Sequence, residues 1–173
     1  MATGLFFAPS PMIKLFRPVL LLCCLTLAAC GFHLRGPRPL PFASIYLAMD
    51  PYADFTAALT RQIKTSGSTQ VVSKVEDAEV QLQVTRNDQQ KDILTLNSSG
   101  TVREYKLKRR FAYRLTGKDG HEVTPLSEIQ ITRDVSFNDS QALAKEQEEL
   151  LLYRDMDADL LQQLMRRLAA TRL

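Results

Sequence analysis

The sequence has few of the residues on which catalysis and metal binding usually depend. It contains two histidines and three cysteines among 173 residues. His33 and His121 stand far apart and form no cluster, so neither a zinc site nor a Ser-His-Asp triad is indicated. A glycine-rich phosphate-binding loop is also missing. These absences argue against an enzyme, and we expect no catalytic residue, no metal and no cofactor.

Two of the three cysteines, Cys23 and Cys24, lie in an apolar run near the N-terminus. This run follows Lys14 and Arg17 and is too short to cross a bilayer, which needs about 20 residues. A basic segment followed by a short apolar segment is typical of a secretory signal peptide. We therefore expect residues 1–29 to be a signal peptide, with Met12, where the basic segment begins, as an alternative start.

The third cysteine follows the small residues that close this run, in Leu27-Ala28-Ala29-Cys30. The pattern resembles the bacterial lipobox, in which the cysteine sulfur takes a diacylglycerol and the new amino terminus is acylated. The alternative is a buried cysteine in an N-terminal helix. We expect Cys30 to be the lipid attachment site, which leaves the exported domain without a disulfide and dependent on its hydrophobic core.

The processed chain divides into a tether and one domain. Residues 30–43 carry Pro37, Pro39 and Pro41, which forbid a helix and favour an extended chain. The remaining length, 44–173, suits a single domain. The net charge of +3 includes Lys14 and Arg17 of the leader, so any electrostatic function must come from local patterning.

Hydrophobic periodicity predicts an α+β domain. A strand is expected at 44–49, followed by a helix that Asp50 caps, that carries an apolar stripe and that Gly67 ends. Alternating patterns predict strands near 80–85, 101–116 and 129–137, with 93–96 continuing or following the first of them. A final helix of about 30 residues is expected from residue 139 or 140, with apolar residues at helical spacing: Leu143, Leu150, Tyr153, Leu160, Leu164 and Leu168.

The strand at 101–116 divides its side chains between an apolar face, interrupted by Arg109, and a basic face. Between Thr101 and Lys118 there are seven cations and one acid, Glu104. Such a surface favours phosphate-rich ligands, but lysines also protect an exposed sheet edge from stray pairing, and the sequence leaves both interpretations open. Export argues against a nucleic-acid partner. The seven cations are Arg103, Lys106, Lys108, Arg109, Arg110, Arg114 and Lys118.

Three stretches carry a resemblance to a known family. They are Cys30-Gly31-Phe32-His33-Leu34-Arg35-Gly36, the segment from Phe137 to Glu149 with Ala142-Leu143-Ala144-Lys145, and more weakly Gly100 to Tyr105. In this order and spacing they resemble the LptE family of lipopolysaccharide-assembly lipoproteins.

This resemblance implies a non-enzymatic, lipid-anchored protein on the periplasmic side of the outer membrane. It would plug the LptD β-barrel in a 1:1 complex, aid its assembly and bind lipopolysaccharide. The implied fold has two helices packed on one face of a four-stranded mixed, largely antiparallel sheet. The alternative is a subunit of another envelope lipid-transport system that binds phospholipid.

The resemblance also suggests residues that contact lipopolysaccharide. Lys145 matches the lysine of the Ala-Leu-Ala-Lys segment, and Arg133 matches an arginine of the last strand. The family's other basic contact falls at Ser98 or Ser99 here, so its role would pass to other cations of the basic strand. The full set of candidates is Lys145, Arg133, Arg103, Lys106, Lys108 and Arg110.

Overall fold

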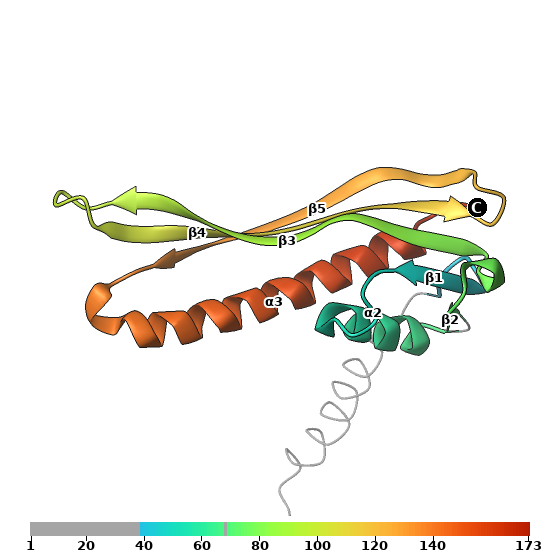
Figure 1. Cartoon of the computed structure of the whole chain (residues 1–173), viewed down its shortest axis with the longest axis horizontal. Coiled ribbons are helices and arrows are strands. Elements are labelled where there is room, and N and C mark those ends of the chain that lie inside the picture. Colours follow the sequence, from blue (N-terminus) through green and yellow to red (C-terminus); the bar gives the residue numbers. More distant parts are fainter. Residues whose placement is uncertain (1–38, 68) are drawn as a thin grey trace, which may run out of the picture. The chain divides into compact units, whose positions relative to one another are not determined.

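The computed structural model describes residues 39–67 and 69–173. The expected lipidation motif with Cys30 and the expected signal peptide lie outside these residues. Within the described residues, two α-helices and five strands follow one another with two short 3-10 turns between them (Figure 1). The strands are β1 (Ser44–Ala48), β2 (Gln70–Val72), β3 (Val80–Leu96), β4 (Val102–Gly117) and β5 (Glu122–Ser136). The helices are α2 (Asp54–Thr65) and α3 (Ala142–Ala169), and the 3-10 turns span Val75–Asp77 and Asp139–Gln141.

All five strands form one mixed sheet in the order β2-β1-β3-β4-β5. β1 pairs in parallel with β2 and β3, whereas β3, β4 and β5 form an antiparallel meander. The expected mixed sheet is confirmed, but the expected number of four strands is wrong. The additional strand, β2, has only three residues, too few to produce a recognisable alternation of apolar and polar side chains.

Helix α2 begins later than the sequence pattern predicts. The carboxylate of Asp50 accepts a hydrogen bond from the backbone N–H of Tyr52 at 3.0 Å, so Asp50 stabilises a turn before the helix and the N-cap is Ala53. The predicted stripe of Phe55, Leu59 and Ile63 is buried as expected.

The two central strands are long and joined by a tight turn. The segments expected at 80–85 and 93–96 belong to one 17-residue strand, β3. At its end, Asn97 Oδ1 accepts hydrogen bonds from the backbone N–H groups of Ser99 and Thr101. Gly100 has a φ of +82°, which residues with side chains rarely adopt. β4 then returns along the full length of β3.

One hydrophobic core contains side chains from both helices and from β1, β3, β4 and β5. β4 supplies Leu107, Phe111, Tyr113 and Leu115, as its alternation predicts. We call this side of the sheet the inner face and the opposite side the outer face. Leu40 and Phe42, which fall in the expected tether, are also buried in this core.

The fully buried side chains of helix α3 lie in its second half, and Leu152 and Tyr153 of its first half pack against the core as partly buried residues. Met156, Leu160, Leu164 and Leu168 are buried, whereas the side chains of Leu143 and Leu150 are 75% and 54% exposed. Of the apolar residues at helical spacing, those at the start of the helix are therefore not covered by the core. No helix in the described part of the chain is long and apolar enough to cross a membrane.

Candidate functional site

The basic strand β4 lies in the interior of the sheet, because it pairs with β3 on one side and β5 on the other. Its lysines and arginines do not border a free edge. Protection of an exposed edge, the second interpretation of this strand, is therefore excluded. The cations of the outer face need another explanation, and the neighbouring strands supply it.

Acidic side chains of β3 face these cations. Lys108 Nζ lies 2.6 Å from Asp92 Oδ2, and Arg110 Nη2 lies 2.7 Å from Asp88 Oδ2. The hydrogen bond from Lys108 lowers the pKa of Asp92, and the hydrogen bond to Asp88 raises the pKa of Arg110. Much of the positive charge of Lys108 and Arg110 is thus balanced within the sheet.

The ion pairs of Asp88 and Asp92 depend on a β-bulge in β3 that the sequence pattern does not reveal. Val80, Leu82 and Val84 point to the inner face, and the pairing of β3 with β4 shifts by one residue between Val84 and Arg86. A one-residue shift exchanges the faces of all following side chains. Asp88 and Asp92 consequently lie on the outer face, directly opposite Arg110 and beside Lys108.

Arg109 interrupts the apolar face of β4, as predicted, and is only 4% exposed. Its Nε donates to Asp157 Oδ1 of α3 at 2.5 Å, and its Nη2 donates to Asn87 Oδ1 of β3 at 2.6 Å. The guanidinium also lies 5.5 Å from the ring centroid of Phe55 in α2. Arg109 therefore joins the sheet to both helices from a buried position, which is a structural role.

Two of the candidate cations join α3 to β5. Arg133 Nη2 lies 2.5 Å from Asp159 Oδ2. Lys145 Nζ donates to Ser136 Oγ at 3.0 Å and to Glu148 Oε2 at 2.8 Å. Because each is already paired, an anionic ligand would have to compete with or share these contacts.

The turn between β3 and β4 and the start of α3 lie at one end of the domain, which we call the distal end. The backbone N–H of Phe137 donates to the carbonyl of Arg103 at 2.8 Å, and Lys145 binds the adjacent Ser136. These contacts bring the candidates Arg103 and Lys145 to the same end, although 42 positions separate them in the sequence. For Arg103 and Lys106, no ion pair with another described residue is observed.

A further distal cation, Lys91, was not predicted from the sequence. Its Nζ lies 2.5 Å from Glu149 Oε2 and 4.2 Å from the ring centroid of Tyr105. Tyr105 in turn makes an edge-to-face contact with Phe137. Only the shift in β3 brings Lys91 to the inner face, so its isolated position in the sequence gave no signal.

The segments that carry these cations also expose large apolar side chains. They come from the last residues of β3 and from the first half of α3. The two segments are joined by the Lys91–Glu149 pair and by Tyr153, whose hydroxyl donates to the Gln90 carbonyl at 3.1 Å. We call this set the distal apolar surface: Ile93, Leu94, Leu96, Leu143, Leu150 and Leu151.

The described part of the chain has no cluster of three or more histidine, cysteine, aspartate or glutamate side chains that would hold a metal ion. What it offers instead is an amphipathic distal end, where cations border exposed apolar side chains. Such an arrangement suits a ligand with negative charges and hydrocarbon chains.

Comparison with known proteins identifies relatives over most of the chain. Residues 42–168 match the LptE family, described as lipopolysaccharide-assembly. The LPS-assembly lipoprotein LptE of Pectobacterium atrosepticum is 32% identical over 90% of this chain and 85% of its own length. That of Yersinia enterocolitica is 30% identical over 85% of this chain and 72% of its own length.

Solved structures agree with this fold. The solution NMR structure of an uncharacterised lipoprotein B from Nitrosomonas europaea is 40% identical and has a TM-score of 0.69. The alignment covers 81% of this chain and 91% of that protein. The rare lipoprotein B of Shewanella oneidensis is 23% identical with a TM-score of 0.63, over 73% of this chain and 94% of that protein, and it supports the fold alone. The chain belongs to the LptE family of lipopolysaccharide-assembly lipoproteins.

Proposed function

We propose that this protein is an outer-membrane lipoprotein that assembles lipopolysaccharide at the cell surface together with the β-barrel LptD. Membership of the LptE family supports a role in lipopolysaccharide assembly. The observation that carries the proposal in the structure is the distal end, whose segments carry Arg103, Lys145 and Lys91 together with six exposed apolar side chains. Lipopolysaccharide carries phosphates and acyl chains, which match these two kinds of surface.

The barrel-plug role is supported by the outer face of the sheet. Figure 1 draws α2 and α3 below the sheet, and we propose that both cover the inner face and leave the outer face to the barrel. That face carries the ion pairs of Lys108 and Arg110 and is polar. The interior of an outer-membrane barrel is polar as well, so the two surfaces are compatible in a 1:1 complex.

Anchoring is assigned to Cys30, whose thiol would carry the diacylglycerol and whose amino group would carry a further acyl chain. Each buried methylene contributes about 0.8 kcal/mol, and a single chain binds a membrane only marginally. Several chains on one cysteine therefore hold the domain stably on the periplasmic side of the outer membrane. The role requires no metal and no catalytic residue.

Depletion of the protein tests this function. Cells that lose it should display less lipopolysaccharide at their surface, because delivery to the outer leaflet would fail. Restoring the wild-type chain should recover surface display, whereas a Cys30→Ser chain, which lacks the anchor, should not. Antibody or dye labelling of surface lipopolysaccharide provides the readout.

The same experiment separates the alternative function. A subunit of another envelope transporter that binds phospholipid would leave surface lipopolysaccharide unchanged on depletion and alter phospholipid distribution instead. Unchanged lipopolysaccharide display in depleted cells would therefore contradict our proposal and favour the alternative.

Charge reversal at the distal end should weaken lipopolysaccharide binding. We expect the double variant Arg103→Glu/Lys145→Glu to bind lipopolysaccharide at least tenfold more weakly than the wild type. Both cations lie at this end, and a reversed charge repels phosphate. The reversal of Lys108 and Arg110 is the matched control, since it changes the same number of charges at positions of β4 that pair with the middle of β3 rather than at the distal end. The affinity of each variant for purified lipopolysaccharide is measured. Equal losses of affinity in the two variants would show that binding depends on the overall charge of the domain rather than on the distal end.

A further inference from the structure

A second polar site lies on the outer face at the opposite end of the sheet. It is a depression of about 390 Å³ formed by the first residues of β3, the last residues of β4, the turn after β4 and the segment before β3. Gln83 lies 13 residues along β3 from Leu96, which corresponds to roughly 40 Å. The site is therefore separate from the distal end. We call it the proximal pocket.

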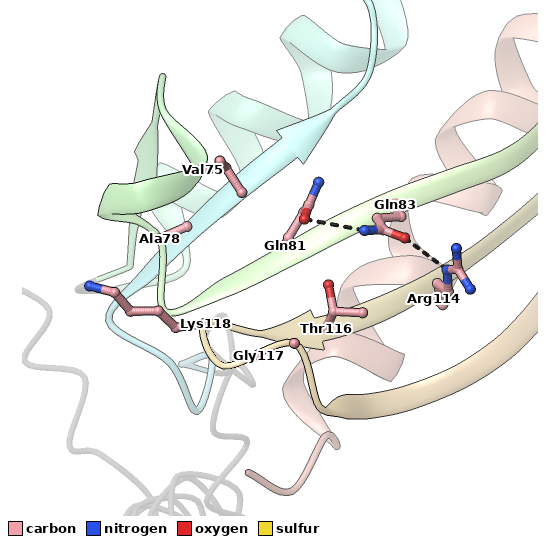
Figure 2. A pocket seen from close by; sticks show the side chains of 9 residues that line it. Val75, Ala78, Gln81, Gln83, Arg114, Thr116, Gly117 and Lys118 are labelled. Atoms are coloured by element: carbon pink, nitrogen blue, oxygen red, sulfur yellow. Dashed lines mark hydrogen bonds between the residues drawn. The ribbon is translucent and has the colours of Figure 1, made fainter.

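Four side chains form its floor as two cross-strand pairs. Gln81 lies opposite Thr116, and Gln83 lies opposite Arg114. Side chains that are directly opposite in an antiparallel pair share one face, and Figure 2 shows all four projecting to the same side of the strands. Lys118, in the turn after β4, also lines the pocket, and Figure 2 shows its side chain extending away from these four.

The hydrogen bonds among these side chains use the glutamine oxygens as acceptors and leave several N–H and O–H donors without a partner from this set. Gln81 Oε1 accepts from Gln83 Nε2 at 3.2 Å, and Gln83 Oε1 accepts from Arg114 Nε at 2.8 Å. Each amide oxygen thereby accepts one hydrogen bond within the site. The Gln81 amide nitrogen, the two terminal nitrogens of Arg114 and the Thr116 hydroxyl are left to donate to a ligand.

The proximal pocket also differs from the rest of the outer face in its charge balance. Arg110 and Lys108 each face an aspartate across the strands, whereas Arg114 faces Gln83. No acidic residue lines the pocket, and Arg114 and Lys118 supply two positive charges. Within the described ranges, neither cation makes an ion pair.

The walls of the pocket are held in place by the backbone. Lys118 N–H donates to the carbonyl of Glu79 at 3.0 Å, which fixes the turn after β4 against the start of β3. The hydroxyl of Ser44 accepts from Glu79 N–H at 2.9 Å and donates to the Asp77 carbonyl at 3.1 Å. These bonds position Ala78, a lining residue, so the site is built before a ligand arrives.

We propose that the proximal pocket binds a phosphate group. A phosphate has several acceptor oxygens and a negative charge, and the terminal nitrogens of an arginine form paired hydrogen bonds with two of them. The Gln81 amide and the Thr116 hydroxyl complete the set of donors, and Lys118 adds charge from the margin. The volume lies within the range of small-molecule sites, with room for a phosphate and an attached glycerol unit.

Two sources of phosphate fit this chemistry, free inorganic phosphate and a phospholipid headgroup. The start of β1 adjoins the pocket through Ser44. Residues 31–38, which precede the described chain, span at most roughly 28 Å when fully extended. If Cys30 carries the lipid, an assignment that rests on the proposed function, the chain is anchored in a leaflet that contains phospholipid headgroups. The phosphate site itself does not depend on that assignment.

Calorimetric titration of the full chain in detergent micelles tests the site with two probes, inorganic phosphate and sn-glycerol 3-phosphate, at constant ionic strength. We expect saturable binding and at least a tenfold loss of affinity in Arg114→Gln. Arg110→Gln, from the same strand and face but paired with Asp88, should bind within twofold of the wild type. Thr116→Val provides a second variant that preserves every charge, and it should weaken binding several-fold.

The outcomes separate the sources and decide the proposal. Tighter binding of glycerol 3-phosphate assigns the site to a phospholipid headgroup, and tighter binding of inorganic phosphate assigns it to free phosphate. Failure of both probes to saturate would overturn the proposal. Equal losses in Arg114→Gln and Arg110→Gln would also overturn it, because the interaction would then be general attraction to a basic surface.

Discussion

Replacing Arg109 by methionine should lower the free energy of unfolding by about 3 kcal/mol, because removing one member of a buried ion pair leaves the other partners uncompensated. Asp157 and Asn87 would each lose a hydrogen bond from the guanidinium, and the Phe55 ring would lose its cation contact. The Asp157 carboxylate is one-third exposed, so water relieves part of this cost. Urea unfolding of the mature chain, followed by circular dichroism, measures the change.

The neighbouring arginine is the matched control. Arg110→Met removes an ion pair of similar length, with Asp88 at 2.7 Å, from the same strand but from the outer face. Solvent-exposed ion pairs contribute little to stability, so this variant should remain close to the wild type. Equal destabilisation by the two variants would show that Arg109 does not join the sheet to the helices in the way described.

Replacing Leu160 by alanine should destabilise the domain by about 2–5 kcal/mol, the range for truncating a fully buried leucine. Leu160 is fully buried in the second half of α3, among the core side chains contributed by the sheet. The cavity left by the missing methyl groups adds to the lost burial. Urea unfolding again measures the effect.

Truncating a leucine in the first half of α3 should have little effect on stability. Leu150 is more than half exposed, so Leu150→Ala should change the free energy of unfolding by less than about 0.5 kcal/mol. The Leu150→Asp variant, however, should bind lipopolysaccharide several-fold more weakly than the wild type, because a charge would replace part of the distal apolar surface. A Leu150→Ala variant as unstable as Leu160→Ala would contradict the division of α3 into a core half and a ligand-facing half.

Much of the fold could be predicted because its signals are local. The alternation in β4 identified the inner face, and four-residue spacing identified the buried stripe of α2. β2 escaped prediction because three residues carry no periodicity. The exposure of Leu143 and Leu150 could not be predicted, because leucines at helical spacing indicate an apolar face but do not show whether another element covers it.

The charge arrangement of the candidate site could not be predicted because it depends on the register between strands. Asp88 and Asp92 follow Val84 by four and eight residues. A strand that alternated regularly would therefore place them on the inner face with Val84. The bulge before Arg86 moves them to the outer face, beside Arg110 and Lys108. The basic strand read from the sequence is therefore largely compensated in the fold, and the uncompensated cations lie toward its two ends.

The central claim is that this lipoprotein acts as the partner of an outer-membrane barrel in lipopolysaccharide assembly. Its most direct test is purification of the lipidated full chain from detergent-solubilised outer membranes, with the mass and stoichiometry of bound proteins determined. We predict that a large β-barrel protein, LptD, is recovered in a 1:1 complex with the chain. Recovery of the chain as a clean monomer from those membranes would contradict the account.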